Sequence, residues 1–351
     1  MMMIKRIFQI FPIALLLLNC GTSMKQTGAN GSQAAMKSHT FTKVADVKWA
    51  APRGFDLTMD IYTPDTKKRS YPVIIMYHGG GWLINNKSIM DEGAAYLASH
   101  GEYIVCNVNY RLLGDLENTV TMDEIVSDAL GARLWVRENI AKYGGDPKRI
   151  IVTGDSAGGH LATMVATQGH RMAEDGDFNP PNYTFRPSYL PADGIKASDA
   201  NVQAAIISYG AFNPYAEGSN SFESASNIFW QLGGAQPRGI MGRDYNPTDH
   251  AERYKMISPI HLVDAATSRN YPPMLFTVGS KDNLTTPASI QAYMDKLKMA
   301  GHDDLTYWVH EGRPHAFLDS GSNAFLGIEF QRDAVPALNY MLDYLNGLFY
   351  A

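Results

Sequence analysis

The chain has 351 residues, of which 45% are hydrophobic and 19% charged, and its formal net charge at pH 7 is −5. This balance is typical of a globular protein and argues against both intrinsic disorder and a membrane-embedded bundle. The length is enough to bury a full core in one large domain or two small ones. No long run of one sign would neutralise a row of phosphates, so we expect no nucleic-acid partner.

The N-terminus has the pattern of an export signal. A Lys-Arg pair at residues 5–6 precedes an apolar run over residues 7–18, which is too short to span a bilayer about 30 Å thick. The run ends in Leu-Leu-Asn-Cys-Gly, which resembles the lipobox of bacterial lipoproteins, although Asn19 stands where Gly, Ala or Ser is usual. The resemblance implies a signal peptide over residues 1–20 and lipidation at Cys20. We therefore expect an exported protein that contacts the membrane of a bacterial cell envelope only through this lipid anchor.

A polar stretch over residues 21–38 is rich in Gly, Ser and Gln and predicts a flexible tether. The folded domain is expected to occupy residues 39–351. The only cysteine besides Cys20 is Cys106, which lies in a strand-like segment. With Cys20 lipidated, Cys106 has no partner, so we expect no disulfide and a small buried side chain.

Apolar or β-branched segments predict the strands of a parallel sheet covered on both faces. They occupy residues 73–77, 103–108, 149–153, 204–208 and 274–278. Ahead of them, the alternating segment 55–61 predicts an antiparallel edge strand. Between most of them lie helical patterns: a capping box at Thr121 begins a helix that ends at Gly144, and Pro287 begins another that ends at Gly301. This alternation predicts an α/β fold with a mostly parallel, doubly wound sheet.

Two long segments, 171–201 and 213–257, break this alternation. The first contains four prolines, and the second carries Phe222, Phe229 and Trp230. Long irregular segments inside compact domains are usually functional lids or disordered. The aromatic residues favour a small packed cap, and a surface excursion stays open as the alternative.

Residues 154–158 read Gly-Asp-Ser-Ala-Gly and match G-x-S-x-G. The motif follows the predicted strand at 149–153 and precedes a helical segment at 160–168. A nucleophile elbow requires this strand–turn–helix setting, in which flanking glycines permit the sharp turn that exposes the serine hydroxyl. Ser156 is therefore the candidate nucleophile.

Residues 78–82 read His-Gly-Gly-Gly-Trp and follow the predicted strand at 73–77. Glycines let the backbone approach a reacting carbonyl, so the N–H groups of Gly80 and Gly81, with that of Ala157, predict an oxyanion hole. His78 is expected to hold this loop in shape. Glycine runs also bind phosphate, but no Gly-Lys-Ser/Thr or G-x-G-x-x-G follows.

A serine nucleophile needs a base, and the base needs an orienting carboxylate that lies between serine and histidine in the chain order of this fold. Asp282 follows the strand at 274–278, and His315 follows a strand-like segment at 305–310. Both would lie at the carboxyl edge of the sheet, where such sheets place their sites. The competing residues precede that last strand or belong to it: His302, Asp303, Asp304 and His310. No histidine pair has zinc spacing, so we expect no metal.

Several segments together resemble the hormone-sensitive-lipase-like esterases. They are the His-Gly-Gly-Gly-Trp loop, Asn-Tyr-Arg-Leu at 109–112, Gly-Gly-Asp-Pro at 144–147 and Gly-Asp-Ser-Ala-Gly-Gly at 154–159. Met-Asp-Ile-Tyr at 59–62 and Ser-Pro-Ile at 258–260 are similar to bacterial acetylxylan/feruloyl-esterase-like (BD-FAE-like) enzymes. The resemblance covers about residues 40–348 and implies the α/β-hydrolase fold, carboxylic-ester hydrolysis and no cofactor. It leaves acetyl, feruloyl and other short acyl groups, on sugars or small alcohols, open as substrates.

Two other functions stay open as alternatives. A serine exopeptidase uses the same triad order on the same fold, but such enzymes usually carry a propeller domain, for which this chain has no room. A non-catalytic binding module of hydrolase ancestry would typically have lost a member of the triad, and all three residues are present here.

Overall fold

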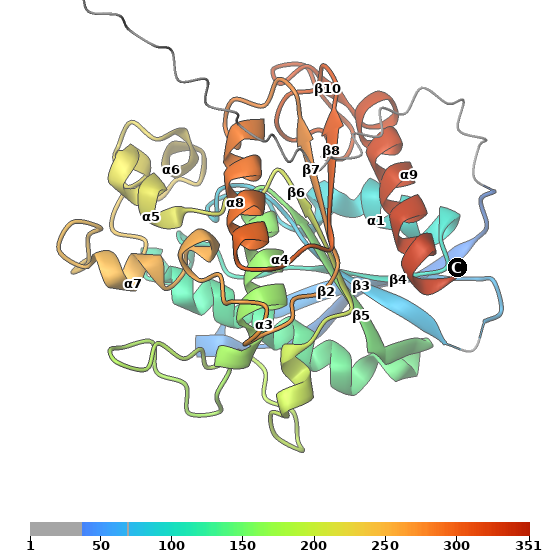
Figure 1. The fold of residues 1–351 in the computed structure, drawn as a ribbon, viewed down its shortest axis with the longest axis horizontal. Coiled ribbons are helices and arrows are strands. Elements are labelled where there is room, and N and C mark those ends of the chain that lie inside the picture. Colours follow the sequence, from blue (N-terminus) through green and yellow to red (C-terminus); the bar gives the residue numbers. More distant parts are fainter. Residues whose placement is uncertain (1–36, 69) are drawn as a thin grey trace, which may run out of the picture. The chain divides into compact units, whose positions relative to one another are not determined.

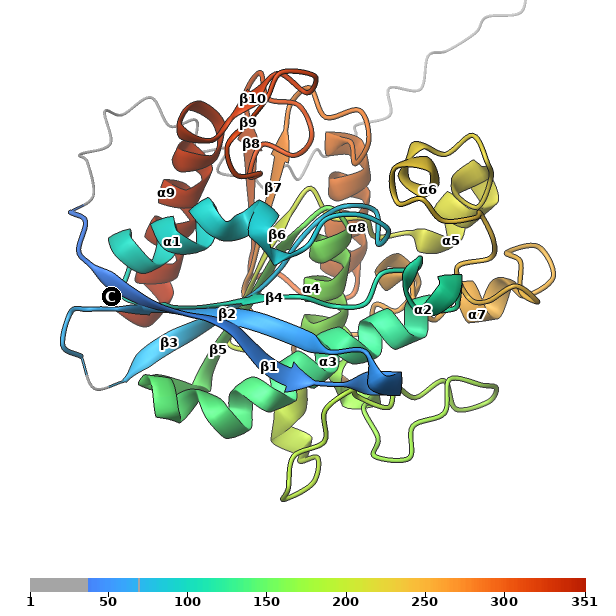
Figure 2. The same ribbon diagram turned by 180° about the vertical axis from the view of Figure 1, so that it is seen from behind.

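The computed structural model describes residues 37–68 and 70–351. The predicted signal peptide, Cys20 and nearly all of the predicted tether lie outside the described residues. An eight-stranded sheet has the order β1-β2-β4-β3-β5-β6-β7-β8 (Figures 1 and 2). The strands are β1 Phe41–Ala50, β2 Leu57–Pro64, β3 Tyr71–Tyr77, β4 Ile104–Val108, β5 Gly145–Asp155, β6 Ala204–Ser208, β7 Met274–Gly279 and β8 Leu305–His310. From β4 to β8 the neighbours pair in parallel, and β2 runs antiparallel to β1 and β4. The predicted α/β-hydrolase fold class is confirmed.

Helices cover both faces of the sheet, as Figures 1 and 2 show. The helices α1 and α9 pack together on one face, and α3, α4 and α8 cover the other. Strands β3, β4 and β6 are buried along their whole length, which is why their sequences are mostly apolar rather than alternating. The longer helices are α1 Asp91–His100, α3 Met122–Asn139, α4 Ala157–Gln168, α8 Pro287–Met299 and α9 Phe330–Phe349. The short elements are α2 Asp115–Asn118, α5 Pro214–Glu217, α6 Ile228–Leu232, α7 Ala251–Lys255, β9 Ser322–Asn323 and β10 Ile328–Glu329.

The helix signals in the sequence act as expected. The Glu124 carboxylate accepts the backbone N–H of Thr121 at 3.0 Å, which completes the capping box at the start of α3. A 3₁₀ turn extends α3 to Gly144, whose φ of +86° ends it. Pro287 takes the first position of α8 behind the N-cap Thr286.

The prediction of an edge strand at 55–61 was wrong. This segment forms β2, which lies between β1 and β4 and is mostly buried. The edge is β1, most of whose residues are exposed. Its pairing with β2 is interrupted between Val44 and Val47, where Asp46 has a φ of +53°. A register shift and an exposed surface on both faces weaken the alternation by which an edge strand is usually detected.

The two irregular segments lie in different places. Residues 171–201 pack along the outer side of α3, where the Ser188 backbone N–H donates to Ser127 and Tyr189 contacts Glu138 (Figure 1). Residues 213–257 contain α5, α6 and α7, which lie together beyond α8 in the same view. In the described part of the chain, no helix is both long and apolar enough to cross a membrane.

A buried ion pair joins the loop after β4 to α3. The Arg111 guanidinium donates to both carboxylate oxygens of Asp128, at 2.9 Å from Nε and 2.7 Å from Nη2. The Asp128 side chain is fully buried, and it also accepts the backbone N–H of Arg111. Such a bidentate pair in a dry site fixes the two elements relative to each other.

We expect Arg111→Met to lower the free energy of unfolding by about 3 kcal/mol, because it leaves the Asp128 carboxylate buried without its cation. The double variant Arg111→Met/Asp128→Leu should recover most of the loss, since it buries no charge. Urea denaturation of the wild type and both variants measures this. A single variant as stable as the wild type would contradict the prediction.

Candidate active site

The structure places Ser156 in a strained turn between β5 and α4. Its backbone has φ +52° and ψ −117°, a conformation that non-glycine residues rarely adopt. The turn is held by hydrogen bonds from the Ser156 N–H to the Ser208 carbonyl and from the N–H groups of His160 and Ala211 to the Ser156 carbonyl. The predicted strand–turn–helix around the G-x-S-x-G motif is therefore present.

Ser156, His315 and Asp282 form one chain of hydrogen bonds. The Asp282 side chain is fully buried and lies 2.8 Å from His315 Nδ1. A carboxylate only accepts hydrogen bonds, so Nδ1 carries the proton and donates it to Asp282. The other ring nitrogen, Nε2, then accepts from the Ser156 hydroxyl at 3.0 Å. The arrangement prepares the serine hydroxyl for proton transfer to the imidazole.

The loops after β7 and β8 bring Asp282 and His315 together. A Cβ on Gly279, at the end of β7, would lie 2.2 Å from the Arg313 carbonyl oxygen, so only glycine permits this approach. The Lys281 N–H donates to the same carbonyl. The candidate residues rejected from the sequence lie elsewhere: His310 Nε2 bonds to the Asp333 carbonyl and His302 Nε2 to that of Asp264.

Two contacts in this site were not found from the sequence. The Thr285 hydroxyl donates to Asp282 Oδ2 at 3.1 Å and lies 3.2 Å from His315 Nδ1, so it contacts both residues of the pair. The Thr285 N–H also donates to Asp282 Oδ1. Tyr209 packs edge-on against the His315 ring, with centroids 4.8 Å apart. Two sequence signals could have indicated these residues. Thr285 carries a hydroxyl three positions after the loop residue Asp282, and Tyr209 is an aromatic residue directly after β6.

The predicted oxyanion-hole residues lie on two neighbouring segments. Gly80 and Gly81 have φ values of +120° and +58°, and Ala157 begins α4. A Cβ on Gly80 would lie 2.3 Å from the Ile84 carbonyl oxygen. Within the described residues, no hydrogen bond uses the N–H groups of Gly80, Gly81 or Ala157.

His78 holds the glycine loop in shape, as its place in the sequence suggests. Its ring stacks on Tyr110 at 4.3 Å, and the Tyr110 hydroxyl donates to the His78 carbonyl at 2.6 Å. Nδ1 of His78 bonds to the Gly79 carbonyl. Burial lowers the pKa of His78 to about 4, so the ring is neutral at pH 7.

Asp155 connects the same loop to the serine turn. A Cβ on Gly79 would lie 2.4 Å from Asp155 Oδ2, so the backbone of Gly79 packs directly on this buried carboxyl group. Burial raises the pKa of Asp155 to about 6, and the nearby His315 and the Gly79 N–H oppose that rise. The glycine loop and the Ser156 turn are thus both in contact with the buried carboxyl group of Asp155.

Trp82, at the end of the glycine loop, is fastened to α4 and to the segment after α7. Trp82 Nε1 donates to His160 Nδ1 at 3.2 Å, and His160 Nε2 donates to the Ile257 carbonyl at 2.8 Å. His160 must therefore be neutral, with its proton on Nε2. Burial lowers the pKa of His160 to about 4, which agrees with this tautomer.

Aromatic side chains of the segment 213–257 cover the glycine loop. The Phe222 ring meets Trp82 edge-on, with centroids 5.6 Å apart. A Cβ on Gly81 would lie 2.7 Å from the ring of Phe229, which belongs to α6. This segment therefore contacts the loop directly, at the residue whose N–H is a predicted oxyanion donor.

In the described part of the chain, no cluster of three or more His, Cys, Asp or Glu side chains is arranged to hold a metal ion. Cys106 is buried in β4, and burial raises the pKa of its thiol.

Comparison with known proteins identifies the family. The family model BD-FAE matches residues 59–297. The chain belongs to the BD-FAE family. Within the BD-FAE match lie the glycine loop, the Ser156 turn and Asp282, whereas His315 follows it.

Curated relatives of this BD-FAE chain carry esterase names. Esterase LipQ of Mycobacterium tuberculosis is 30% identical over 268 residues, 76% of this chain and 55% of its own length. Carboxylesterase NlhH of the same species is 38% identical over 111 residues, 32% of this chain and 34% of its own. The chain thus spans about half or less of the length of these relatives.

Solved structures of Thermogutta terrifontis esterase 2 share the fold. The form phosphonylated by cyclosarin has a TM-score of 0.61 and 21% identity, covering 90% of this chain and 96% of that chain. The propionate-bound form has a TM-score of 0.59 and 22% identity, covering 91% and 98%.

The His160 hydrogen bonds predict a pH dependence of stability. The folded pKa of about 4 lies below the ordinary value of 6.5, so the unfolded state binds the proton first as the pH falls. The stability that neutral His160 provides is present above pH 6.5 and is lost as the pH falls towards 4. Between pH 7 and pH 5 it should decrease by about 2 kcal/mol.

His160→Gln tests this, because a glutamine amide can accept from Trp82 and donate to the Ile257 carbonyl without titrating. We expect the variant to lose about 2 kcal/mol less than the wild type between pH 7 and pH 5 in urea denaturation. His78 titrates equally in both proteins and cancels. Equal losses in the two proteins would show that His160 is not held neutral.

Proposed function

We propose that this chain is a serine esterase that hydrolyses carboxylic esters through an acyl-enzyme. The observation that carries the proposal is the hydrogen-bond chain from Ser156 through His315 to Asp282, next to N–H groups that bond to no described residue. The esterase names of the relatives in the family support it.

In the proposed mechanism, His315 Nε2 takes the hydroxyl proton as Ser156 Oγ attacks the ester carbonyl. The N–H groups of Gly80, Gly81 and Ala157 stabilise the negative oxygen of the tetrahedral intermediate, and losing one such donor typically costs about 3–4 kcal/mol of transition-state stabilisation.

His315 then gives its proton to the departing alcohol, and the carbonyl re-forms as the acyl-enzyme. In the second half, His315 takes a proton from water, which attacks the acyl group, and Ser156 leaves with its proton restored. Asp282 orients the imidazole and stabilises its charged form throughout.

The proposed substrates are esters of small acyl groups, including acetyl or feruloyl groups on carbohydrates. Phe229 lies half-buried against Gly81, and an aromatic ring in this place can stack on a sugar or a phenolic acid. Solved forms of the Thermogutta esterase 2 with propionate and butyrate bound support short acyl chains.

Ser156→Ala tests the nucleophile. We expect kcat to fall by about 10⁴-fold or more on p-nitrophenyl acetate, because no other group in the site can form the acyl-enzyme. The same assay is run with further substrates: p-nitrophenyl butyrate and octanoate, acetylated xylan, methyl ferulate and aminoacyl-naphthylamides. A fluorophosphonate probe should label the wild type and the exposed control Ser219→Ala, but not Ser156→Ala.

If the protein cleaved the naphthylamides and left all esters intact, the esterase proposal would be wrong and a serine exopeptidase would take its place. If the folded wild type neither reacted with the probe nor cleaved any substrate, a non-catalytic binding module would be the remaining candidate function. A Ser156→Ala variant with a tenth of the activity would reject Ser156 as the nucleophile.

Thr285 is the positioning residue of this scheme. Thr285→Val removes the hydroxyl that donates to Asp282 Oδ2, and we expect kcat to fall about tenfold with KM nearly unchanged, as for a lost bond to a charged group. Thr285→Ser keeps the hydroxyl and should recover most of kcat. If valine and serine variants behave alike, Thr285 acts only through packing.

A further inference from the structure

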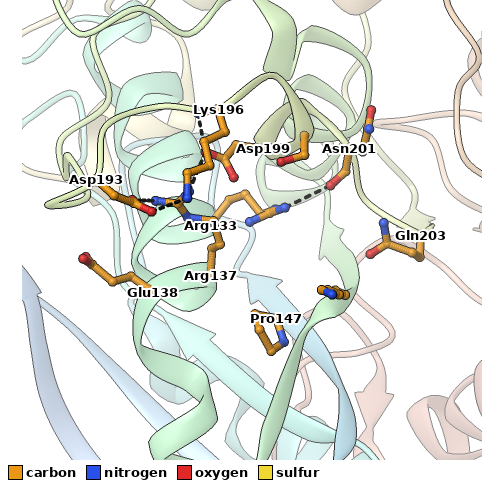
Figure 3. A pocket seen from close by; sticks show the side chains of 11 residues that line it. Arg133, Arg137, Glu138, Pro147, Asp193, Lys196, Asp199, Asn201 and Gln203 are labelled. Carbon is orange, nitrogen blue, oxygen red and sulfur yellow. Dashed lines mark hydrogen bonds and ion pairs between the residues drawn. The ribbon is translucent and has the colours of Figure 1, made fainter.

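A second pocket lies at the opposite end of the sheet from Ser156. Its volume is about 510 Å³, and its walls come from the second half of α3, the start of β5 and residues 193–203 (Figure 3). Lys148 lies near the start of β5 and Ser156 directly follows its end. At about 3.3 Å per residue, the strand separates the two sites by about 25 Å.

Arg133 of α3 lines this pocket and is almost completely buried, with 4% of its surface exposed. Figure 3 shows its side chain extending from α3 toward Asn201, whose carbonyl accepts from Nη2 at 3.0 Å. The Nε and Nη1 atoms have no hydrogen-bond partner among the described residues. Burial lowers the pKa of Arg133 to about 10, partly opposed by the charge of Asp199, so the group is charged at pH 7.

A buried cation with free N–H groups is costly, because burial removes its hydration and nothing replaces it. In the described part of the chain, the two other buried arginines have partners for their guanidinium groups. Arg238 donates to the carbonyl groups of four residues, and Arg111 is paired with Asp128. Arg133 is the contrasting case: its Nε and Nη1 atoms are buried without an acceptor, and the residue lines a pocket.

The acidic residues in the pocket are already engaged. Asp193 pairs with Arg137 and Lys196, and Asp199 pairs with Arg137 at 3.2 Å. Glu138 accepts from the Tyr189 hydroxyl and the Ala192 N–H. No carboxylate within 4 Å forms an ion pair with Arg133 among the described residues. The exposed Lys148 adds another positive charge to the rim.

We propose that this pocket binds a small organic oxyanion, whose carboxylate or phosphate group pairs with the unpaired charge of the Arg133 guanidinium. Guanidinium groups suit these planar or multi-oxygen acceptors, and charge-assisted bonds of this kind are stronger than neutral ones. The volume falls within the range of about 300–1,000 Å³ typical of small-molecule sites. A ligand larger than a single inorganic ion therefore fits. The site is independent of the esterase function.

Isothermal titration calorimetry with citrate and with inorganic phosphate, at matched ionic strength, tests the proposal on the whole protein. We expect saturable binding to the wild type and to the control Lys142→Met, which removes a cation outside the pocket near the end of α3. Arg133→Met should bind at least tenfold more weakly. Tighter binding of citrate assigns a carboxylate ligand, and tighter binding of phosphate assigns a phosphorylated one.

Arg133→Met should fold, because removing an unpaired buried charge is neutral or stabilising. A second measurement is independent of that variant: saturation with the tighter anion should shift the Arg133 Nε–H resonance in ¹⁵N-resolved NMR. The Arg238 Nε–H, which donates to the Asn118 carbonyl, should not move. The proposal is overturned if the wild type binds neither anion, if Arg133→Met binds as tightly as the wild type, or if the Arg133 resonance stays in place.

Discussion

Where β3 and β5 end side by side, the Tyr77 carbonyl oxygen lies so close to Gly158 that a Cβ there would be 2.0 Å away. This approach places the loop after β3 against the start of α4, which follows β5. It therefore brings the loop that carries Gly80 and Gly81 against the turn that carries Ser156, although 75 positions of the sequence separate Gly81 from Ser156. A Cβ on Gly154 would lie 2.3 Å from the Gly158 carbonyl, so both flanking positions of the serine turn require glycine.

A turn of this kind stores conformational strain, on the order of 1–3 kcal/mol for each unfavourable residue. Ser156 and Trp82 both have positive φ and belong to the two segments that meet here. Three sets of contacts hold them: the backbone bonds of Ser156, the Asp155 carboxyl under Gly79, and the link from Trp82 through His160 to Ile257. The last of these reaches the segment 213–257, so the shape of the glycine loop depends on a part of the chain that also covers it with Phe229.

Much of this could be predicted from the sequence, because the steric rules involved are local. Strand–turn–helix spacing and glycine placement identified Ser156, and the chain order and post-strand positions identified Asp282 and His315. Contacts that depend on how distant loops meet could not be found this way. Thr285 reads as an ordinary polar residue until the loops after β7 and β8 are packed together. Because β1 is exposed on both faces, it lacks the usual alternation, and the sequence pattern instead predicts β2 as the edge strand.

Arg133 marks the limit of sequence reasoning most clearly. In a helix with a buried face, an arginine is expected to reach solvent with its charged end. Arg137, one turn further along α3, has ion-pair partners for its guanidinium in Asp193 and Asp199. Arg133 instead lies under residues 199–203, where the Asn201 carbonyl satisfies only one of its nitrogens. The carboxyl edge of an open α/β sheet is where substrates bind, and the amino edge ordinarily contributes only stability. A buried cation without a counter-charge contributes no stability there, so its presence in the lining of a pocket is explained best by a ligand that supplies the missing negative charge.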